Sequence, residues 1–156
     1  MAKMIVIEGQ VPVSGKELRK SDVVQRLEDW QDRLKKLFDQ IDQWRVQTLP
    51  NVESSRDRTF QIEEELMRKF GIKPGTVPTY TITQGSKRLS FVPSGLWIIG
   101  ANGRVNVVGG KKEFMLVDMA EPGSCKSKWM LVSHDHRKVL EEFDRNKLRV
   151  LFEKAA

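Results

Sequence analysis

Residues 94–110, SGLWIIGANGRVNVVGG, hold five glycines whose spacing is close to that of a phosphate-binding loop. A dinucleotide fingerprint needs a strand, then the glycines, then a helix whose N-terminus faces the pyrophosphate. Here a second strand-like segment follows the glycines, and Asn102-Gly103 is the preferred pair for a two-residue type I′ hairpin turn. Gly109-Gly110-Lys111-Lys112 lacks P-loop spacing and is predicted to be another turn. The stretch therefore predicts a β-hairpin and no nucleotide site.

The same period-two pattern covers much of the C-terminal half of the chain. It predicts six strands, at residues 80–83, 89–92, 96–101, 104–108, 113–119 and 128–133. Their short connections predict an antiparallel meander, because parallel pairing needs long crossovers. We also consider a sheet that curls into a small barrel or sandwich. Segments 96–101 and 113–119 are apolar on both alternating faces, which predicts a sheet covered on both sides.

The N-terminal half carries a different, helical period. From Ser21 to Thr48, apolar residues recur in alternating steps of three and four, which predicts one long amphipathic helix ended by Pro50. This apolar stripe consists of Val23, Leu27, Trp30, Leu34, Leu37, Ile41 and Trp44. It fits two partners: the next helix of the same chain, or a second protein or copy. In the second case the interface residues are Trp30, Leu34, Leu37, Ile41 and Trp44.

Two further helices are predicted. Residues 55–70, followed by Gly71 and Pro74, are interpreted as a second helix that folds back on the first as a helical hairpin. Residues 136–154 are interpreted as a C-terminal helical segment that Asp144 can restart as an N-cap. The expected fold is therefore α+β. A helical hairpin with an N-terminal extension occupies residues 1–73, and an antiparallel sheet with a C-terminal helix occupies residues 74–156, docked as one unit.

Composition narrows the classes of function. The 156 residues include 27 Lys and Arg against 21 Asp and Glu, a net charge of +6 that favours acidic partners. The single cysteine excludes an internal disulfide framework and suits a reducing compartment, so we expect a cytoplasmic protein. No signal peptide or apolar span long enough to cross a bilayer is indicated, so no membrane partner is expected. No motif calls for a cofactor.

Basic residues gather in three of the predicted turns. In a meander, alternate turns lie at the same end of the sheet. The first, third and fifth predicted turns therefore bring five basic side chains together: Lys87, Arg88, Arg104, Lys126 and Lys128. Such a cluster suits phosphate oxygens of nucleic acid or an acidic protein surface. The alternative is that these are ordinary solvated turn residues.

Catalytic signals are sparse. His134 and His136 are two residues apart and, with Cys125, form a weak candidate metal site that has no visible fourth ligand. A helix cap explains Ser133 and Asp135 beside them more simply. Asp118 lies in an otherwise apolar strand, where a strand-end position or pairing with Lys or Arg is expected. An enzyme is therefore the less favoured class.

Three hypotheses of function follow. The first is a non-catalytic protein–protein interaction module that associates with a copy of itself, as an oligomer, or with another protein through the first helix. The second is a nucleic-acid-binding domain that uses the basic turns. The third is a metal-assisted hydrolase around His134 and His136.

Overall fold

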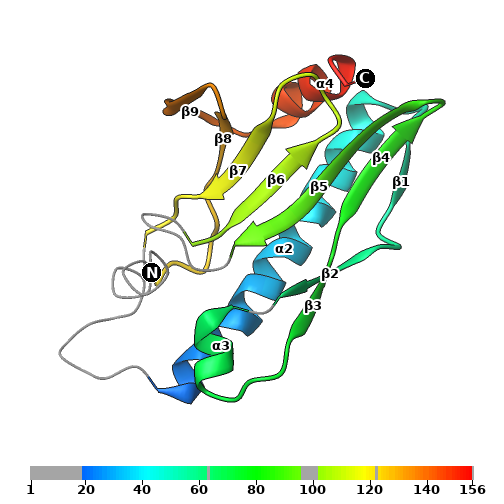
Figure 1. The fold of residues 1–156 in the computed structure, drawn as a ribbon. Helices are drawn as coiled ribbons and strands as arrows, with labels where there is room; N and C mark the ends of the chain where they lie inside the picture. The colour runs from blue at the N-terminus through cyan, green and yellow to red at the C-terminus, as the bar shows by residue number, and fades with distance from the viewer. Residues whose placement is uncertain (1–18, 63, 96–101, 122, 156) are drawn as a thin grey trace.

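The computed structural model describes residues 19–62, 64–95, 102–121 and 123–155. A long helix, α2 (Lys20–Thr48), runs behind a twisted antiparallel sheet (Figure 1). The side chain of Asp22 accepts the backbone N–H of Arg19 at 2.8 Å, which satisfies one of the free donors at the start of the helix. The helix ends at Thr48, with Leu49 as its C-cap just before Pro50. The helix predicted over residues 21–48 is confirmed.

The main sheet has seven strands in the order β1-β4-β5-β6-β7-β8-β9, and all neighbours are antiparallel. The strands are β1 (Glu53–Ser55), β4 (Tyr80–Gln84), β5 (Lys87–Gly95), β6 (Arg104–Val108), β7 (Phe114–Asp118), β8 (Trp129–Ser133) and β9 (His136–Glu142). From β4 onward each strand pairs with its sequence neighbour, so the predicted meander is confirmed. In the described part of the chain β1 and β9 are free edges, so the sheet is open and the barrel alternative is wrong.

The predicted helical hairpin is also wrong. Residues 53–70 form the short strand β1, a second strand β2 (Thr59–Ile62) and a five-residue helix, α3 (Glu65–Lys69). Strand β2 pairs with β3 (Gly75–Pro78) in a separate two-stranded sheet, and β1 pairs with β4. The TFQI sequence of β2 alternates polar and apolar residues, a period-two signal that the apparent helical stripe concealed.

The predicted C-terminal helix is only half correct. Residues 136–142 form β9, and helix α4 (Arg145–Glu153) begins after Asp144. The Asp144 side chain accepts the backbone N–H of Lys147 at 2.9 Å, so the predicted N-cap is confirmed. Strand β9 pairs only with β8, and all of its residues are exposed. Its charged HRKVLEE sequence is typical of an edge strand that resists aggregation.

The predicted turn at Asn102-Gly103 is wrong as well. A type I′ turn needs positive φ at both residues, and Gly103 does not have it. Instead, the backbone N–H of Asn102 donates to the carbonyl of Asp118 at 2.7 Å, and Gly103 accepts from Asp118 at 3.1 Å, so both residues extend the β6–β7 pairing. The strand predicted at 96–101 lies outside the described residues.

The hydrophobic core lies between one face of the sheet and the two helices α2 and α4. Phe38 of α2 stacks on Tyr80 of β4 with 5.6 Å between ring centroids, and Phe91 of β5 packs against Tyr80 in turn. Leu148, Leu151 and Phe152 of α4 belong to the same core. No described helix lies on the opposite face of the sheet, so within the described residues helices cover only one of the two sides (Figure 1).

Trp30 fixes how closely α2 approaches the sheet. Its indole is fully buried and packs against Trp129 at 6.0 Å between ring centroids. A Cβ atom on Gly103 would come within 2.2 Å of Trp30 Cζ3. Gly103 is therefore needed for this close contact between α2 and β6, and not for a turn.

Candidate docking groove

The predicted interface residues of the first helix lie in the core. Trp30, Leu34 and Ile41 have 0% exposure and Leu37 has 3%. The apolar stripe is buried inside its own chain, as the first of its two predictions expected. Its partners are the sheet and α4, not a helix over residues 55–70. Only Trp44, near the end of α2, stays partly exposed.

The five predicted basic residues do not converge at one end of the sheet. Lys87 and Arg88 begin β5, whereas Arg104 begins β6 and pairs with Gly95 at the other end of β5. Lys126 and Lys128 lie in the connection between β7 and β8, at the same end as Arg104. Two turns were predicted between residues 92 and 104, but β5 pairs directly with β6, so a single connection joins these strands. Every later turn therefore lies at the opposite end of the sheet from the one predicted. Lys87 and Arg88 are therefore separated from the other three.

The candidate metal ligands are also apart. Cys125 precedes β8 and His134 follows it, so the strand separates them. His134 has a carboxylate in the neighbouring turn instead, with Glu113 Oε2 at 3.8 Å from Nδ1. Among the described residues, no group of three His, Cys, Asp or Glu side chains is placed to hold a metal ion.

A surface groove of about 410 Å³ lies between the C-terminal half of α2 and the β7–β8 connection. We call it the docking groove. Three segments line it: Lys36, Leu37, Gln40 and Trp44 of α2, residues 125–129 before and at the start of β8, and Glu142 at the end of β9 with Phe143 after it. The groove thus gathers residues from all three sequence hypotheses. Leu37 and Trp44 were predicted as interface residues, Lys126 and Lys128 as part of the basic cluster, and Cys125 as a candidate metal ligand.

The wall formed by the β7–β8 connection is held in place by Arg33 of α2. Arg33 is 5% exposed, and its Nη1 lies 2.7 Å from Asp118 Oδ2 and 3.0 Å from Ser127 Oγ. It also donates to the carbonyl of Ser124 and, through Nε, to Asp29 at 2.7 Å. Burial opposes its charge, but the hydrogen bonds to Asp29 and Asp118 outweigh burial and raise the pKa of Arg33. The groove wall is therefore anchored by a permanent cation.

Aromatic side chains form the floor. Trp44 meets Phe143 edge to face with 5.5 Å between centroids, and Trp129 packs on the buried Trp30. Both indoles are partly exposed in the groove, and each is braced by a ring from the core. Such rigid, half-buried aromatic rings are common anchors at protein interfaces, because little side-chain entropy is lost on binding.

The rim is mainly cationic. Lys36, Lys126 and Lys128 are exposed around the floor, together with one carboxylate, Glu142. Lys36 lies 2.9 Å from Asp32, and this hydrogen bond raises the pKa of Lys36. The groove therefore combines an apolar floor with three positive charges and one negative charge.

Sequence reasoning missed Lys36, Gln40, Trp129 and the pair Glu142-Phe143 as site residues. Lys36 directly precedes Leu37 on the predicted helix. A helical wheel that marked the residues flanking the apolar stripe would have identified it. Glu142 and Phe143 carried no such signal, because the segment was interpreted as helix.

No protein-family model matches the chain, and no curated protein sequence and no solved structure is significantly similar to it. No helix among the described residues is long and apolar enough to cross a membrane.

Proposed function

We propose that the protein is a non-catalytic protein–protein interaction module that binds an acidic polypeptide segment in the docking groove, with α2 as one wall. The observation that carries the proposal is the partly exposed pair Trp44 and Trp129 surrounded by exposed lysines. Interface cores favour aromatic anchors, and rims of opposite charge steer the partner and select it. An acidic segment with one large apolar side chain matches both features.

The mixed charge of the rim favours a polypeptide over a nucleic acid. Glu142 lines the same groove as Lys126 and Lys128. A phosphate backbone carries uniform negative charge and would be repelled by this carboxylate, whereas a polypeptide can place a cation opposite it. Trp44 and Trp129 also pack against Phe143 and Trp30, so part of each ring is not free to stack on a base.

The chemistry of the groove supports binding in preference to catalysis. Cys125 is exposed there, but a cysteine nucleophile needs a base within hydrogen-bond reach. The two histidines of the chain, His134 and His136, lie beyond the far end of β8. Cys125 therefore has no histidine base in the groove.

The experiment is a selection of peptides from a random displayed library on the wild-type protein, followed by affinity measurements. The selected peptides should be rich in Asp and Glu and should share one Trp, Phe or Leu. The double variant Lys126→Glu/Lys128→Glu should weaken them by at least about tenfold, because attraction becomes repulsion. The control Lys20→Glu/Lys73→Glu makes the same change in net charge at exposed sites away from the groove and should leave affinity within about twofold.

Trp44→Ala tests the apolar anchor and should weaken the same peptides without unfolding the protein. Equal affinity of selected peptides for the wild type and the Lys126→Glu/Lys128→Glu variant would contradict the proposal. Salt-dependent binding of oligothymidylate that this variant abolishes, with no peptide selected, would assign the groove to single-stranded nucleic acid instead.

A further inference from the structure

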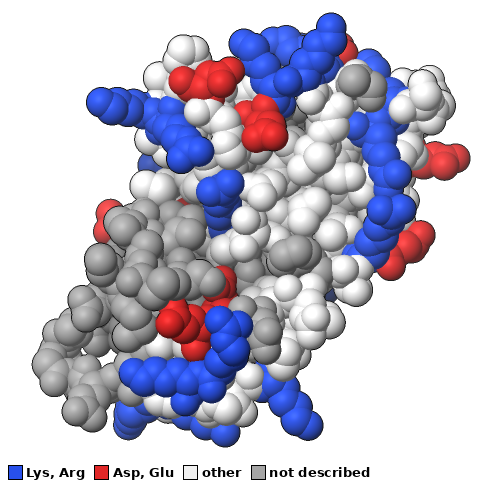
Figure 2. Space-filling model, viewed as in Figure 1, with Lys and Arg blue, Asp and Glu red and all other residues white. Residues whose placement is uncertain are grey.

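A second cavity lies at the other end of the sheet, between helix α4 and the β6–β7 turn. Its volume is about 450 Å³, within the range of pockets that enclose small ligands. An isolated β-bridge between Gly110 and Ala155 joins the turn to the residues after α4 and closes one side. Figure 2 shows several Lys and Arg side chains over this end of the molecule, with a few carboxylates among them.

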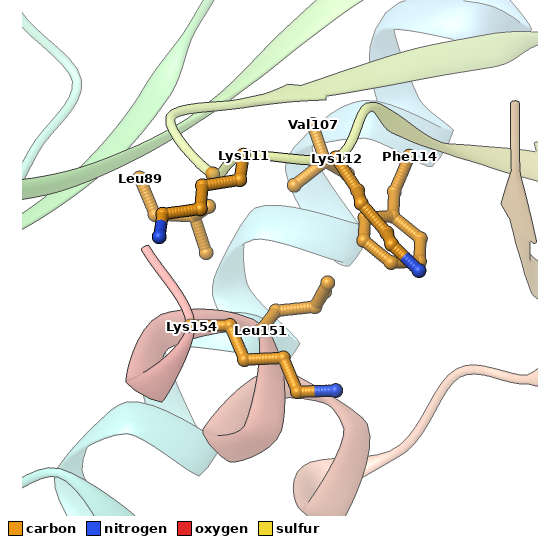
Figure 3. Close-up of a pocket in the computed structure, with 8 residues that line it drawn as sticks. Leu89, Val107, Lys111, Lys112, Phe114, Leu151 and Lys154 are labelled. Carbon is orange, nitrogen blue, oxygen red and sulfur yellow. The ribbon is translucent and has the colours of Figure 1, made fainter. Parts of the chain in front are cut away.

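The floor of this cavity is apolar and comes from four elements. Leu89 of β5, Val107 of β6, Phe114 of β7 and Leu151 of α4 line it (Figure 3). Leu89, Val107 and Leu151 are 2%, 4% and 6% exposed, so the floor lies below the molecular surface. No carboxylate is among the lining residues. The interior therefore favours a hydrocarbon or aromatic group.

Three lysines surround the opening. Lys112 of the turn and Lys154 after α4 approach from opposite walls and end on the same side of the cavity, while Lys111 extends to the other side (Figure 3). Among the described residues, no carboxylate lies within ion-pair distance of any of the three. These charges therefore lack an internal partner in the described part of the chain.

The end of α4 does not cancel this positive field. Free carbonyls at a helix C-terminus carry partial negative charge, which would weaken anion binding nearby. Here Lys87 of β5 donates to the carbonyl of Glu153 at 3.1 Å and lies over the ring of Phe152 at 5.4 Å. Because Lys87 offsets the charge of that carbonyl, Lys112 and Lys154 remain available to a ligand.

We propose that this cavity, the lysine-rimmed pocket, binds a small amphipathic anion with a single apolar chain, such as a medium-chain fatty acid. The chain lies on Leu89, Val107, Phe114 and Leu151, and the carboxylate lies between the ammonium groups of Lys112 and Lys154. This site is separate from the docking groove and does not depend on it. No covalent step is involved.

Calorimetric titration with octanoate tests the pocket, with acetate and octanol as probes of the head group and the chain alone. Octanoate should bind once per chain, and affinity should rise from butanoate to octanoate by up to roughly fourfold per methylene. Acetate should not bind at the same concentrations, and octanol should bind at least about tenfold more weakly, because it lacks charge-assisted hydrogen bonds. Methyl NMR signals of Leu89, Val107 and Leu151 should shift on binding.

The double variant Lys112→Gln/Lys154→Gln should weaken octanoate by at least about tenfold. The control is Lys73→Gln, which removes the charge of an exposed lysine beyond α3 and should leave the affinity for octanoate unchanged. All three lysines are exposed, so these variants should keep the wild-type melting temperature. The proposal is overturned by absence of saturable octanoate binding, by equal binding to the double variant, or by methyl shifts confined to other residues. Binding to anionic phospholipid vesicles without binding to octanoate would also overturn it, since it would indicate surface charge without a pocket.

Discussion

Arg33 of α2 and Asp118 at the end of β7 form a buried ion pair, with Nη1 2.7 Å from Oδ2 and side-chain exposures of 5% and 0%. The other carboxylate oxygen of Asp118 accepts the backbone N–H groups of Ala120 at 3.1 Å and Lys128 at 2.8 Å. The pair therefore links the long helix to both ends of the β7–β8 connection. A core ion pair thus positions the lysines of the docking groove.

Replacing Arg33 with Met should lower the free energy of unfolding by about 3–5 kcal/mol, because Asp118 would remain buried without its cation. Urea denaturation measures the change. Lys35→Met is the control, since it removes only the exposed pair with Asp39, whose side chains are 71% and 44% exposed, and should cost at most about 1 kcal/mol. Equal losses in the two variants would show that the buried pair has no special role.

The heptad pattern of α2 predicted the helix correctly but could not identify what covers it. An apolar stripe looks the same whether it packs on a helix or on a sheet, because only its width and spacing appear in the sequence. Trp30 packs on Trp129 of β8, and α2 also contacts α4, so the elements that cover the stripe come late in the chain. The elements that the apolar stripe packs against are therefore determined by the tertiary fold and not by the local sequence of α2.

Residues 53–70 could not be predicted because their structure depends on distant partners. Strand β1 has three exposed residues and no apolar alternation, and it exists only because it pairs with residues 81–83 of β4. Strand β2 similarly depends on β3. Short edge strands of this kind carry little local signal, since pairing and burial dominate strand preference.

The candidate site could be predicted only as separate pieces. Trp44, Lys128 and Cys125 were each selected from the sequence, but for three unrelated hypotheses. Their convergence depends on the 119–128 connection folding back on α2, which Arg33 and Asp118 direct. The predicted turn at Asn102-Gly103 shifted every later turn to the wrong end of the sheet, so a single local error misplaced the basic cluster.

Gly103→Ala should destabilise the protein by roughly 1–3 kcal/mol or more, because the new methyl group would overlap the indole of Trp30. Trp30 is fully buried, and its indole already packs on Trp129. Gly75→Ala is the control: its Cβ would lie 3.5 Å from Leu27 Cδ2, an ordinary contact, and stability should change by less than about 1 kcal/mol. Thermal unfolding followed by circular dichroism compares them. A neutral Gly103→Ala variant would show that α2 does not lie this close to β6.

Leu34→Asp should abolish cooperative unfolding and should not simply separate a dimer. Leu34 has 0% exposure, so the substitution places an unpaired carboxylate in the core. Val46→Asp, at a site on the same helix that is 59% exposed, should cost at most about 1 kcal/mol, mainly because the charge lies near the helix C-terminus. Urea denaturation and light scattering measure the two properties. A folded Leu34→Asp monomer would indicate that the stripe is an interface after all.

Tyr80, the only tyrosine of the chain, should ionise at unusually high pH. Burial, assisted by the hydrogen bond that its hydroxyl donates to Asp42 at 2.7 Å, raises the pKa of Tyr80 to about 12 from an ordinary value of 10.0. The folded state keeps this proton where the unfolded state has lost it. The contribution to stability is therefore complete below pH 10 and is lost as the pH rises towards 12, by up to about 1.4 kcal/mol per pH unit.

Two measurements test this behaviour. The ultraviolet absorbance of tyrosinate should have its midpoint near pH 12 in the folded protein and near pH 10 in denaturant. The free energy of unfolding of Tyr80→Phe should be about 1 kcal/mol lower than that of the wild type at neutral pH, because Asp42 loses a hydrogen bond. Between pH 10 and 12 it should then fall by less than that of the wild type. Lysines titrate alike in both proteins, so the difference between them isolates Tyr80. A midpoint near pH 10 in the folded protein would mean that the hydroxyl is neither buried nor bonded to Asp42.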